Sequence, residues 1–472
     1  MRIAWHDTAD AALAKAGLAL GEEQRGRARL WWLERLDRAP EGETEMPSPP
    51  GVAPSVLAQA DRLELLGRAL PEGLRTAARF EATRRNAAAA GGQKDGPASE
   101  VGLELLEGTL HTARADRRMA RLRLSGPPDA VFALADQLLA DLPCTVPPAS
   151  LAAEALGSDA GEASLPGGPP VLPSALAVGE ALAWLVASLA RTLVMLAPRA
   201  ASGDGSEPVH QMRVALRRLR TAMTLLKPLL PVQAVLAEAS SGLRTLARAL
   251  APAREWDVFL EGPAPEVAAA FPEDAALARL LKAAHRRREV AYAALRTELE
   301  QGSFRRLVLH LSALAVLQPW RAPGGEDEAA GTPGEPGARA ETGLAEVAPA
   351  LLQRRYKKLL AAASDIASAD AAHLHAIRLR AKRLRYAGEL LSPLFARKEM
   401  QRFLRRLARL QDRLGIVNDA VGVDRLLGEL GAAGRGEAGG IVRGFVAATA
   451  LREREEVAPA WRKFRKHAPF WT

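Results

Sequence analysis

The sequence of 472 residues contains one cysteine, Cys144, and few aromatic side chains. A single cysteine excludes an intramolecular disulfide and a thiolate metal cage, and it suits a reducing compartment. Aromatic residues make up only 4% of the chain, which argues against a surface built to stack nucleic-acid bases. The first ten residues, MRIAWHDTAD, lack the basic and apolar regions of a secretory signal.

Long uninterrupted apolar runs are also scarce. The most apolar stretch, ALAVGEALAWLVASLARTLVML, is broken by Glu180 and Arg191, which favours a buried helix over a membrane span. We therefore expect a soluble, cytoplasmic protein with no membrane partner. The oligomeric state does not follow from the sequence.

Acidic residues are absent from VHQMRVALRRLRTAMTLLKPLL, which begins at Val209. On a helix turning about 100° per residue, Met212, Leu219 and Leu226 share an apolar face. A second face is basic, and like charges three or four residues apart repel by about 0.2–0.5 kcal/mol per pair. In an isolated helix such a face is most often merely solvated. The basic residues are His210, Arg213, Arg217, Arg220 and Lys227, with Arg218 on the flank.

The same pattern returns 165 residues later, in LHAIRLRAKRLRYAGELLSPLF from Leu374. A solvated face requires only polarity, whereas this repeat keeps the residue type at each position. The sequence therefore predicts one architectural unit used twice, with the basic face as its functional feature. The residues His375, Arg378, Lys382, Arg383 and Arg385 take the places of His210, Arg213, Arg217, Arg218 and Arg220.

A second repeated segment follows each basic helix. LARALAPAREWDVFL from Leu246 parallels LARLQDRLGIVNDAV from Leu407, and each is predicted to end in a short polar turn. Asp257 and Asp419 in these turns either cap helices or orient arginines of the basic face. The sequence leaves both interpretations open.

Charge is distributed unevenly around the net value of +9. The regions 171–320 and 350–472 carry +5 and +13, whereas 1–170 and 321–349 carry −5 and −4. Because the excess lies in the two repeats, it points to a polyanionic partner.

Composition divides the chain into domains. The Gly-, Pro- and Ser-rich segment 157–173 is predicted to be a linker, and the acidic segment 321–349 a flexible connection. The regions 174–320 and 350–472 have helical patterns, which predicts two helical bundles within one all-α domain, 174–472. Residues 1–156 contain strand-like alternation in RLWWLERL, LRTAARFEAT, EVGLELLEGTL and RRMARLRLSG, and a helix over 128–143. We predict an α+β domain with a mostly antiparallel sheet there.

The repeated H-x-x-R-x-x-x-[RK]-R-x-R helix resembles the conserved histidine α-helical domain, CHAD, over about 174–472. LARALAPAREWDV, LGIVND and the closing AWRKFRKHAPFW are similar to other segments of that family. The sequence departs from the family pattern at Ala251 and Glu255, where the family has Gly and Asp.

This resemblance implies two pseudo-symmetric four-helix bundles around a basic pore that binds inorganic polyphosphate. It implies no catalytic activity, no cofactor and no metal. The implied location is the cytoplasm, including polyphosphate granules. Lys227 is the weakest assignment because its counterpart is Ser392. The implied binding residues are His210, Arg213, Arg217, Arg218, Arg220, Lys227, Arg254, His375, Arg378, Lys382, Arg383, Arg385 and Tyr386.

The N-terminal region resembles a CYTH domain, the triphosphate tunnel fold, in WHDTADAALAKAGLAL and ARLRLSGPPDAVFALADQLLADLP. The family's opening E-x-E-x-K strand is missing, and Arg121 and Arg123 stand where the family has glutamates. Without those carboxylates Mg²⁺ has few hard oxygen ligands. The resemblance therefore implies a degenerate antiparallel β tunnel without triphosphatase activity.

Three classes of function follow from these patterns. Binding of polyphosphate, a dense line of charge without base edges, suits a lattice of Arg and Lys donors. Non-specific nucleic-acid binding is the first alternative, since a basic face supplies affinity for any polyanion. The second is a triphosphatase or adenylate-cyclase-like activity of the N-terminal domain. For His210 and His375, a structural hydrogen bond at a helix contact competes with a phosphate-binding role.

Overall fold

The computed structural model describes residues 1–36, 49–52, 73–91, 99–157, 172–203, 205–231, 233–321 and 340–471. It forms two compact units. The β unit comprises Met1–Gly167, Val186–Met195 and Gly302–Pro319, and the helical unit comprises Gly168–Leu185, Leu196–Gln301 and Trp320–Thr472. Most of the two predicted linkers lies outside the described residues.

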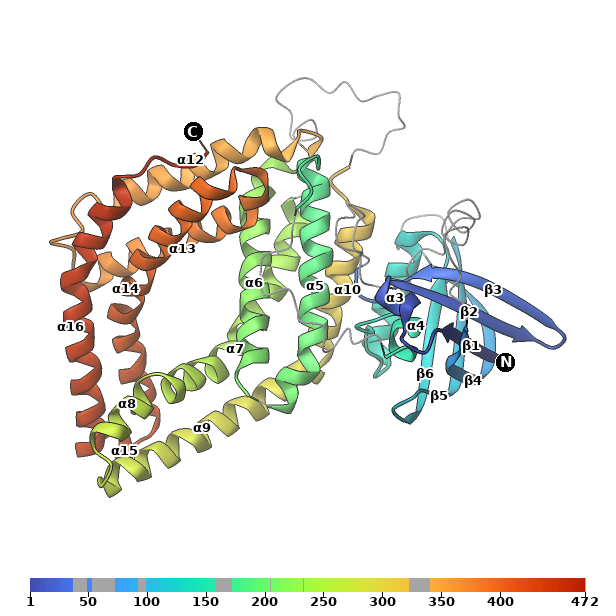
Figure 1. Cartoon of the computed structure of the whole chain (residues 1–472), viewed down its shortest axis with the longest axis horizontal. Helices are drawn as coiled ribbons and strands as arrows, with labels where there is room; N and C mark the ends of the chain where they lie inside the picture. The colour runs from blue at the N-terminus through green and yellow to red at the C-terminus, as the bar shows by residue number, and fades with distance from the viewer. Residues whose placement is uncertain are drawn as a thin grey trace. The chain divides into compact units, whose positions relative to one another are not determined.

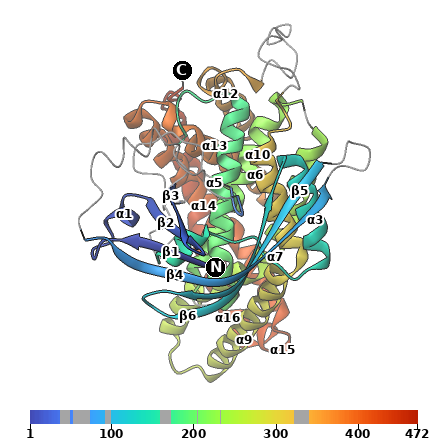
Figure 2. The same ribbon diagram turned by 90° about the vertical axis from the view of Figure 1, so that its right-hand side faces the viewer.

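The β unit is built on one six-stranded sheet in the order β3-β2-β1-β4-β5-β6 (Figure 2). Every neighbouring pair is antiparallel, which confirms the predicted N-terminal antiparallel sheet. The strands are β1 (Arg2–Asp7), β2 (Leu18–Arg25), β3 (Ala28–Arg35), β4 (Arg75–Gly91), β5 (Ser99–His111) and β6 (Asp116–Ser125). The short helix α1 (Ala12–Lys15) lies between β1 and β2, and α3 (Pro128–Asp141) and α4 (Leu151–Ala155) follow β6.

Alternation along the strands gives the sheet two buried faces. One face, here called the inner face, packs Trp5, Phe80 and Leu106 against the segment 149–155 that contains α4. The opposite face packs Val101 against Leu134 of α3. The six-stranded antiparallel arrangement is compatible with a CYTH-like tunnel domain, and its inner face is covered by the chain's own α4 segment.

Two successive series of helices follow the sheet along the chain (Figure 1). The first series is α5 (Val178–Ser202), α6 (Glu207–Leu226), α7 (Gln233–Glu261), α8 (Pro263–Ala270) and α9 (Ala275–Glu300), followed by α10 (Gly302–Leu317); the second is α12 (Leu344–Ala362), α13 (Ala371–Leu391), α14 (Arg397–Glu429), α15 (Ala432–Arg435) and α16 (Glu437–Arg465). Four long helices in each series are consistent with two four-helix bundles. The middle of α5, Val186–Met195, and all of α10 are part of the β unit, and the other helices of the two series belong to the helical unit.

The internal repeat is visible in the helix boundaries. α6 runs into a 3₁₀ turn at Lys227–Leu229, and α13 runs into one at Ser392–Leu394. These turns keep the offset of 165 residues seen between His210 and His375. Each contains a proline, which removes a backbone donor and favours the end of the α-helix.

Helix α5 is long and apolar enough to cross a membrane by length and composition. However, 72% of its most apolar window is buried within the protein. Such burial is typical of a core helix, as predicted from the interruptions at Glu180 and Arg191.

The two helical series contact each other at several places within the helical unit. α6 packs against α13, and α16 packs against α8 and α9. A hydrogen bond of 2.8 Å from Arg287 Nη2 to the carbonyl oxygen of Glu429 joins α9 to the end of α14. An ion pair between Arg425 and Glu255 joins α14 to α7.

Candidate functional site: a cation cluster shared by two helices

The basic face of each repeat is held in place by an apolar face on the same helix. In α6, Met212, Leu219 and Leu226 are buried, as the helical spacing predicted. In α13, Ile377 and Leu384 are buried in the same way. The cationic side chains therefore lie on the remaining faces, half-buried or exposed.

The two basic faces meet where α6 and α13 pack together. The guanidinium carbon of Arg217 lies 4.1 Å from the centroid of the Tyr386 ring, a cation–π contact between the repeats. Tyr386 is only 7% exposed, so Arg217 covers an otherwise buried ring. This contact joins residues 169 positions apart in the chain.

Lys382 is surrounded by positive charge from both repeats. Its pKa is lowered to about 8 by burial, by Arg378 of its own helix and by Arg217 and Arg213 of α6, against the opposing effect of Asp419. An ammonium group gives up its proton more readily when its neighbours are cations. We call Arg213, Arg217, Arg378 and Lys382 the cation cluster.

The first repeat carries the same electrostatic signature. The pKa of Arg213 is lowered by burial and by Arg217 and Arg254, while Glu255 acts in the opposite direction. The pKa of His210 is lowered by burial first and then by Arg254. Its imidazole is therefore mainly neutral at pH 7 in the free protein.

Polar side chains of α14 contact the second repeat directly. His375 Nδ1 is hydrogen-bonded to Asn418 Oδ1, and Arg378 Nη2 lies 3.2 Å from Asp419 Oδ1. A Cβ added to Gly415 would lie 3.6 Å from Arg378 Nη2, an ordinary van der Waals distance, so this guanidinium lies close to the backbone of α14.

The first repeat places Arg254 near His210 and Glu255 near Arg213. Arg254 and Glu255 precede Asn418 and Asp419 by 164 residues. The pairing from Leu246 and Leu407 that the sequence suggested is therefore shifted by three residues. The two sites correspond in position, with Arg254 in the place of Asn418.

Both predicted polar turns are in fact helical. Residues 254–257 lie inside α7 and Asn418 and Asp419 lie inside α14, so neither aspartate caps a helix. Asp419 pairs with an arginine of the cluster. Asp257 instead accepts from Arg288 Nε at 2.7 Å and from the Tyr292 hydroxyl at 2.8 Å.

The flanking arginines differ between the repeats. Arg218 faces Glu389 of α13, which opposes the lowering of its pKa by burial. Arg385 Nε also donates to Glu389, at 2.7 Å. Arg383 instead faces α12, where it helps to lower the pKa of Arg355 to about 10, after burial and Arg354.

The remaining predicted residues lie at the edge of the cluster. Arg220 is exposed on α6, and Lys227 is half-buried in the 3₁₀ turn that follows. Arg254 is also within 3.6 Å of Glu261. Glu389 and Asn418 also lie at the site. Asn418 is part of the repeated segment LGIVND, whereas no spacing in the sequence distinguishes Glu389 from other polar residues of its helix.

Comparison with known proteins bears directly on this helical arrangement. The family model described as "CHAD domain" matches residues 178–428. The chain belongs to the CHAD domain family. The matched range contains α6, α13 and every residue of the cation cluster.

The crystal structure of the CHAD domain from the plant Ricinus communis is similar, with a TM-score of 0.52 and 25% sequence identity. That match covers 62% of this chain and 94% of the plant chain. PptA from Streptomyces chartreusis matches with a TM-score of 0.41 and 16% identity, covering 61% of this chain and 98% of its own. A search of curated proteins found no match.

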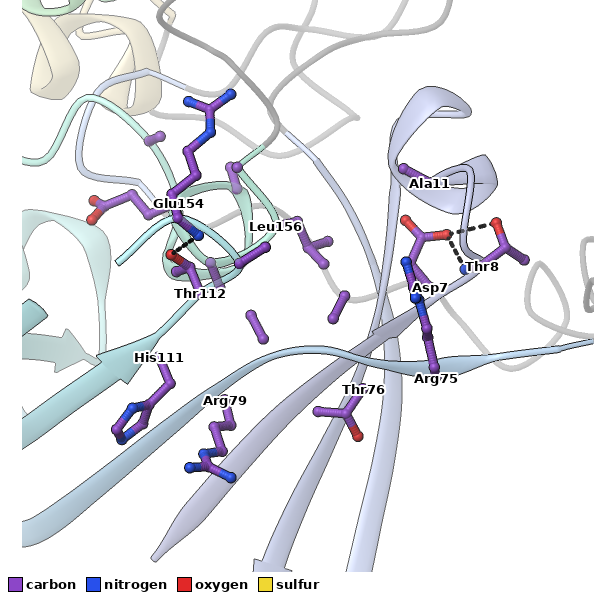
Figure 3. Close-up of a pocket in the computed structure, with 18 of the residues that line it drawn as sticks. Asp7, Thr8, Ala11, Arg75, Thr76, Arg79, His111, Thr112, Glu154 and Leu156 are labelled. Atoms are coloured by element: carbon purple, nitrogen blue, oxygen red, sulfur yellow. Dashed lines mark hydrogen bonds between the residues drawn. The ribbon is translucent and has the colours of Figure 1, made fainter. Parts of the chain in front are cut away.

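The β unit contains a separate pocket of about 940 Å³ (Figure 3). Its charged lining groups already have protein partners. Asp7 accepts from the backbone N–H groups of Leu13 and Ala14 at 2.9 and 3.0 Å, and His111 lies 2.9 Å from Asp116. The cation cluster of the CHAD domain is therefore the stronger candidate site.

Arginines neutralise carboxylates on the inner face of the sheet. Arg84 lies 2.8 Å from Glu23 and 2.7 Å from Glu104, and Arg123 lies 3.3 Å from Glu104. Arg121 is paired with Glu154. Within the described parts of the chain, no group of three or more His, Cys, Asp or Glu is placed to hold a metal ion.

Proposed function

We propose that this CHAD domain binds inorganic polyphosphate through the cation cluster without altering it chemically. The supporting observation is the gathering of Arg213, Arg217, Arg378 and Lys382 from two repeats around one place. Burial first, and then the charges of Arg378, Arg217 and Arg213, lower the pKa of Lys382 to about 8. A polyanion entering this cluster relieves repulsion that the free protein must bear.

Several groups of the cluster are available to a ligand. In the described part of the chain, Arg213 and Lys382 make no hydrogen bond or ion pair, whereas Arg378 is paired with Asp419. Arginine donates in a planar fork that fits a phosphate group, and lysine contributes a compact charge. Together they satisfy successive phosphates without reading any sequence.

The alternative of nucleic-acid binding is less well supported. Tyr386 is the aromatic residue of the basic faces, and it is buried beneath Arg217. It therefore offers no platform for a base, on which single-strand binders usually rely. Competition between labelled polyphosphate and single-stranded DNA at equal total charge tests the proposal, and equal displacement by DNA would contradict it.

We expect the β unit not to hydrolyse triphosphate. Arg84, Arg121 and Arg123 occupy the inner-face carboxylates, and a divalent cation must displace them to be bound. The measurement is phosphate release from tripolyphosphate with Mg²⁺ or Mn²⁺. Multiple metal-dependent turnovers by the purified chain, abolished in an Asp7→Asn, Glu154→Gln variant, would show that the unit is an enzyme.

Polyphosphate affinity should fall as the pH rises above about 8. Lys382 is charged below that value in the free protein, and binding a polyanion requires the charged form. Above pH 8 each binding event must take up a proton, so the contribution of Lys382 declines by up to tenfold per pH unit. A Lys382→Arg variant remains charged and serves as the control. Superimposable pH profiles for the two proteins between pH 7 and 9.5 would disprove the role of Lys382.

A further inference from the structure

A second basic surface lies on α14, at the opposite end of that helix from Asn418 and Asp419. Arg402, Arg405 and Arg409 are exposed, and Arg406 is half-buried among them. We call these four residues the outer arginine row. Their spacings of three and four residues place them along one face of the helix.

No ion pair in the described part of the chain neutralises this row, although Glu399 and Asp412 flank it on α14, each three residues from its nearest arginine. Its four guanidinium groups make no hydrogen bond or ion pair there, and Nη1 of Arg406 is shielded from solvent without a partner. Other arginines of the same helix are paired: Arg413 lies 2.7 Å from Glu453 of α16. The four guanidinium groups repel one another and form no ion pair within the described residues, so the row is better suited to binding an external anion than to stabilising the fold.

The positive charge of the outer arginine row affects a residue of the C-terminal segment, His467. Burial, Arg402, Arg409 and Arg405 lower the pKa of Arg406. His467, which follows α16, also has a lowered pKa, caused by burial and then by Arg406 and Arg402. The C-terminal segment therefore adds a titratable group to the same surface.

The row is distinct from the cation cluster. None of its arginines is among the causes of the pKa shifts of His210, Arg213 or Lys382. Arg405 precedes Asp419 by fourteen residues of continuous helix, which is about 21 Å at 1.5 Å per residue. A single phosphate group cannot touch both surfaces, but a long chain of phosphates can.

The surroundings of the row favour inorganic polyphosphate over other polyanions. The nearby aromatic residues are buried (Phe403, Phe464 and Trp471) or half-buried (Phe395 and Phe470), so nucleic-acid bases find no fully exposed ring to stack on. No large apolar side chain between residues 397 and 411 is exposed, so the surface lacks the anchors of a membrane-binding helix.

We infer that the outer arginine row is a second contact site for polyphosphate. One segment of a polyphosphate molecule binds the cation cluster, and a distant segment of the same molecule binds the outer arginine row. This inference rests on the proposed function and extends it to chain length. A long polyphosphate binds both sites, and the second contact is intramolecular, which raises the overall affinity. A short oligophosphate gains no such second contact.

The test uses the full chain and a triple variant, Arg402→Gln, Arg405→Gln, Arg409→Gln. The matched control is Arg279→Gln, Lys282→Gln, Arg286→Gln on α9, which removes three exposed charges at the same spacing. Binding of tripolyphosphate and of long-chain polyphosphate is measured at several salt concentrations, with helicity checked by circular dichroism.

We expect the row variant to bind long-chain polyphosphate about tenfold more weakly and with a salt slope lower by about two to three units. Its affinity for tripolyphosphate and the long-chain affinity of the control should change by less than about twofold. Equal loss in the control, equal loss for both ligands, or no loss at all would overturn the inference. If the wild-type chain binds neither ligand, the proposed function fails, and this inference fails with it.

Discussion

Replacing Arg213 and Arg217 together by alanine is expected to weaken polyphosphate binding by about 100-fold or more. A hydrogen bond to a charged group contributes about 1.5–3 kcal/mol, and each 1.4 kcal/mol is a factor of ten in affinity. Replacing Arg378 and Lys382 together by alanine should weaken polyphosphate binding by a similar factor, because Lys382 lies close enough to Arg213 and Arg217 for their charges to lower its pKa. Each lost phosphate contact should also lower the slope of log affinity against log salt by about one unit.

A third double variant, Arg354→Ala with Arg383→Ala, controls for simple loss of charge. Both residues are exposed, and both act on Arg355 rather than on the cluster. This variant should bind polyphosphate within about threefold of wild type. If only one of the two cluster variants binds polyphosphate more weakly, the two repeats do not form a shared site, and binding occurs on a surface patch of one repeat. Folding should survive in all three variants because the buried faces of α6 and α13 are unchanged.

The helices that carry the site could be predicted from the sequence because their signal is local. Met212, Leu219 and Leu226 recur at helical spacing, and the repeat marks the basic residues on the other faces. The antiparallel strands of the β unit were predictable for the same reason, since their alternation lies in short segments. Local patterns of this kind require no knowledge of which elements pack together.

The prediction of polar turns was wrong because the preference of Asp and Asn for turns is overridden when side chains of other helices bind them. Asp257 is held near the C-terminal end of α7 by Arg288 and Tyr292 of α9. Those partners lie 31 and 35 residues away along the chain, and no local pattern links them. α7 also continues through Pro252, a residue that more often ends or kinks a helix.

The different partners of Arg218 and Arg383 could not be predicted from the sequence either. The repeat assigns them the same position, yet Arg218 meets Glu389 across the α6–α13 contact. The residue that corresponds to Glu389 in the first repeat is Thr224, which offers no carboxylate to Arg383. Pseudo-symmetry in the sequence therefore predicts where a side chain starts but not the partner that it meets.

Replacing Arg288 by methionine is expected to destabilise the helical unit by about 3–5 kcal/mol. The Asp257 side chain is fully buried, whereas that of Arg288 is 24% exposed. Removing the cation therefore leaves a buried carboxylate whose remaining hydrogen-bond partner, among the described residues, is the Tyr292 hydroxyl.

Adding Asp257→Leu to the Arg288→Met variant should restore part of the loss, since a buried ion pair replaced by apolar residues is often neutral. Asp419→Asn is the control. Its ion pair with Arg378 has a half-exposed carboxylate, and it should change stability by less than about 1 kcal/mol. The measurement is urea unfolding followed by circular dichroism, which reports the loss of helix. A double variant less stable than Arg288→Met alone would mean that Asp257 stabilises the fold through contacts other than this ion pair.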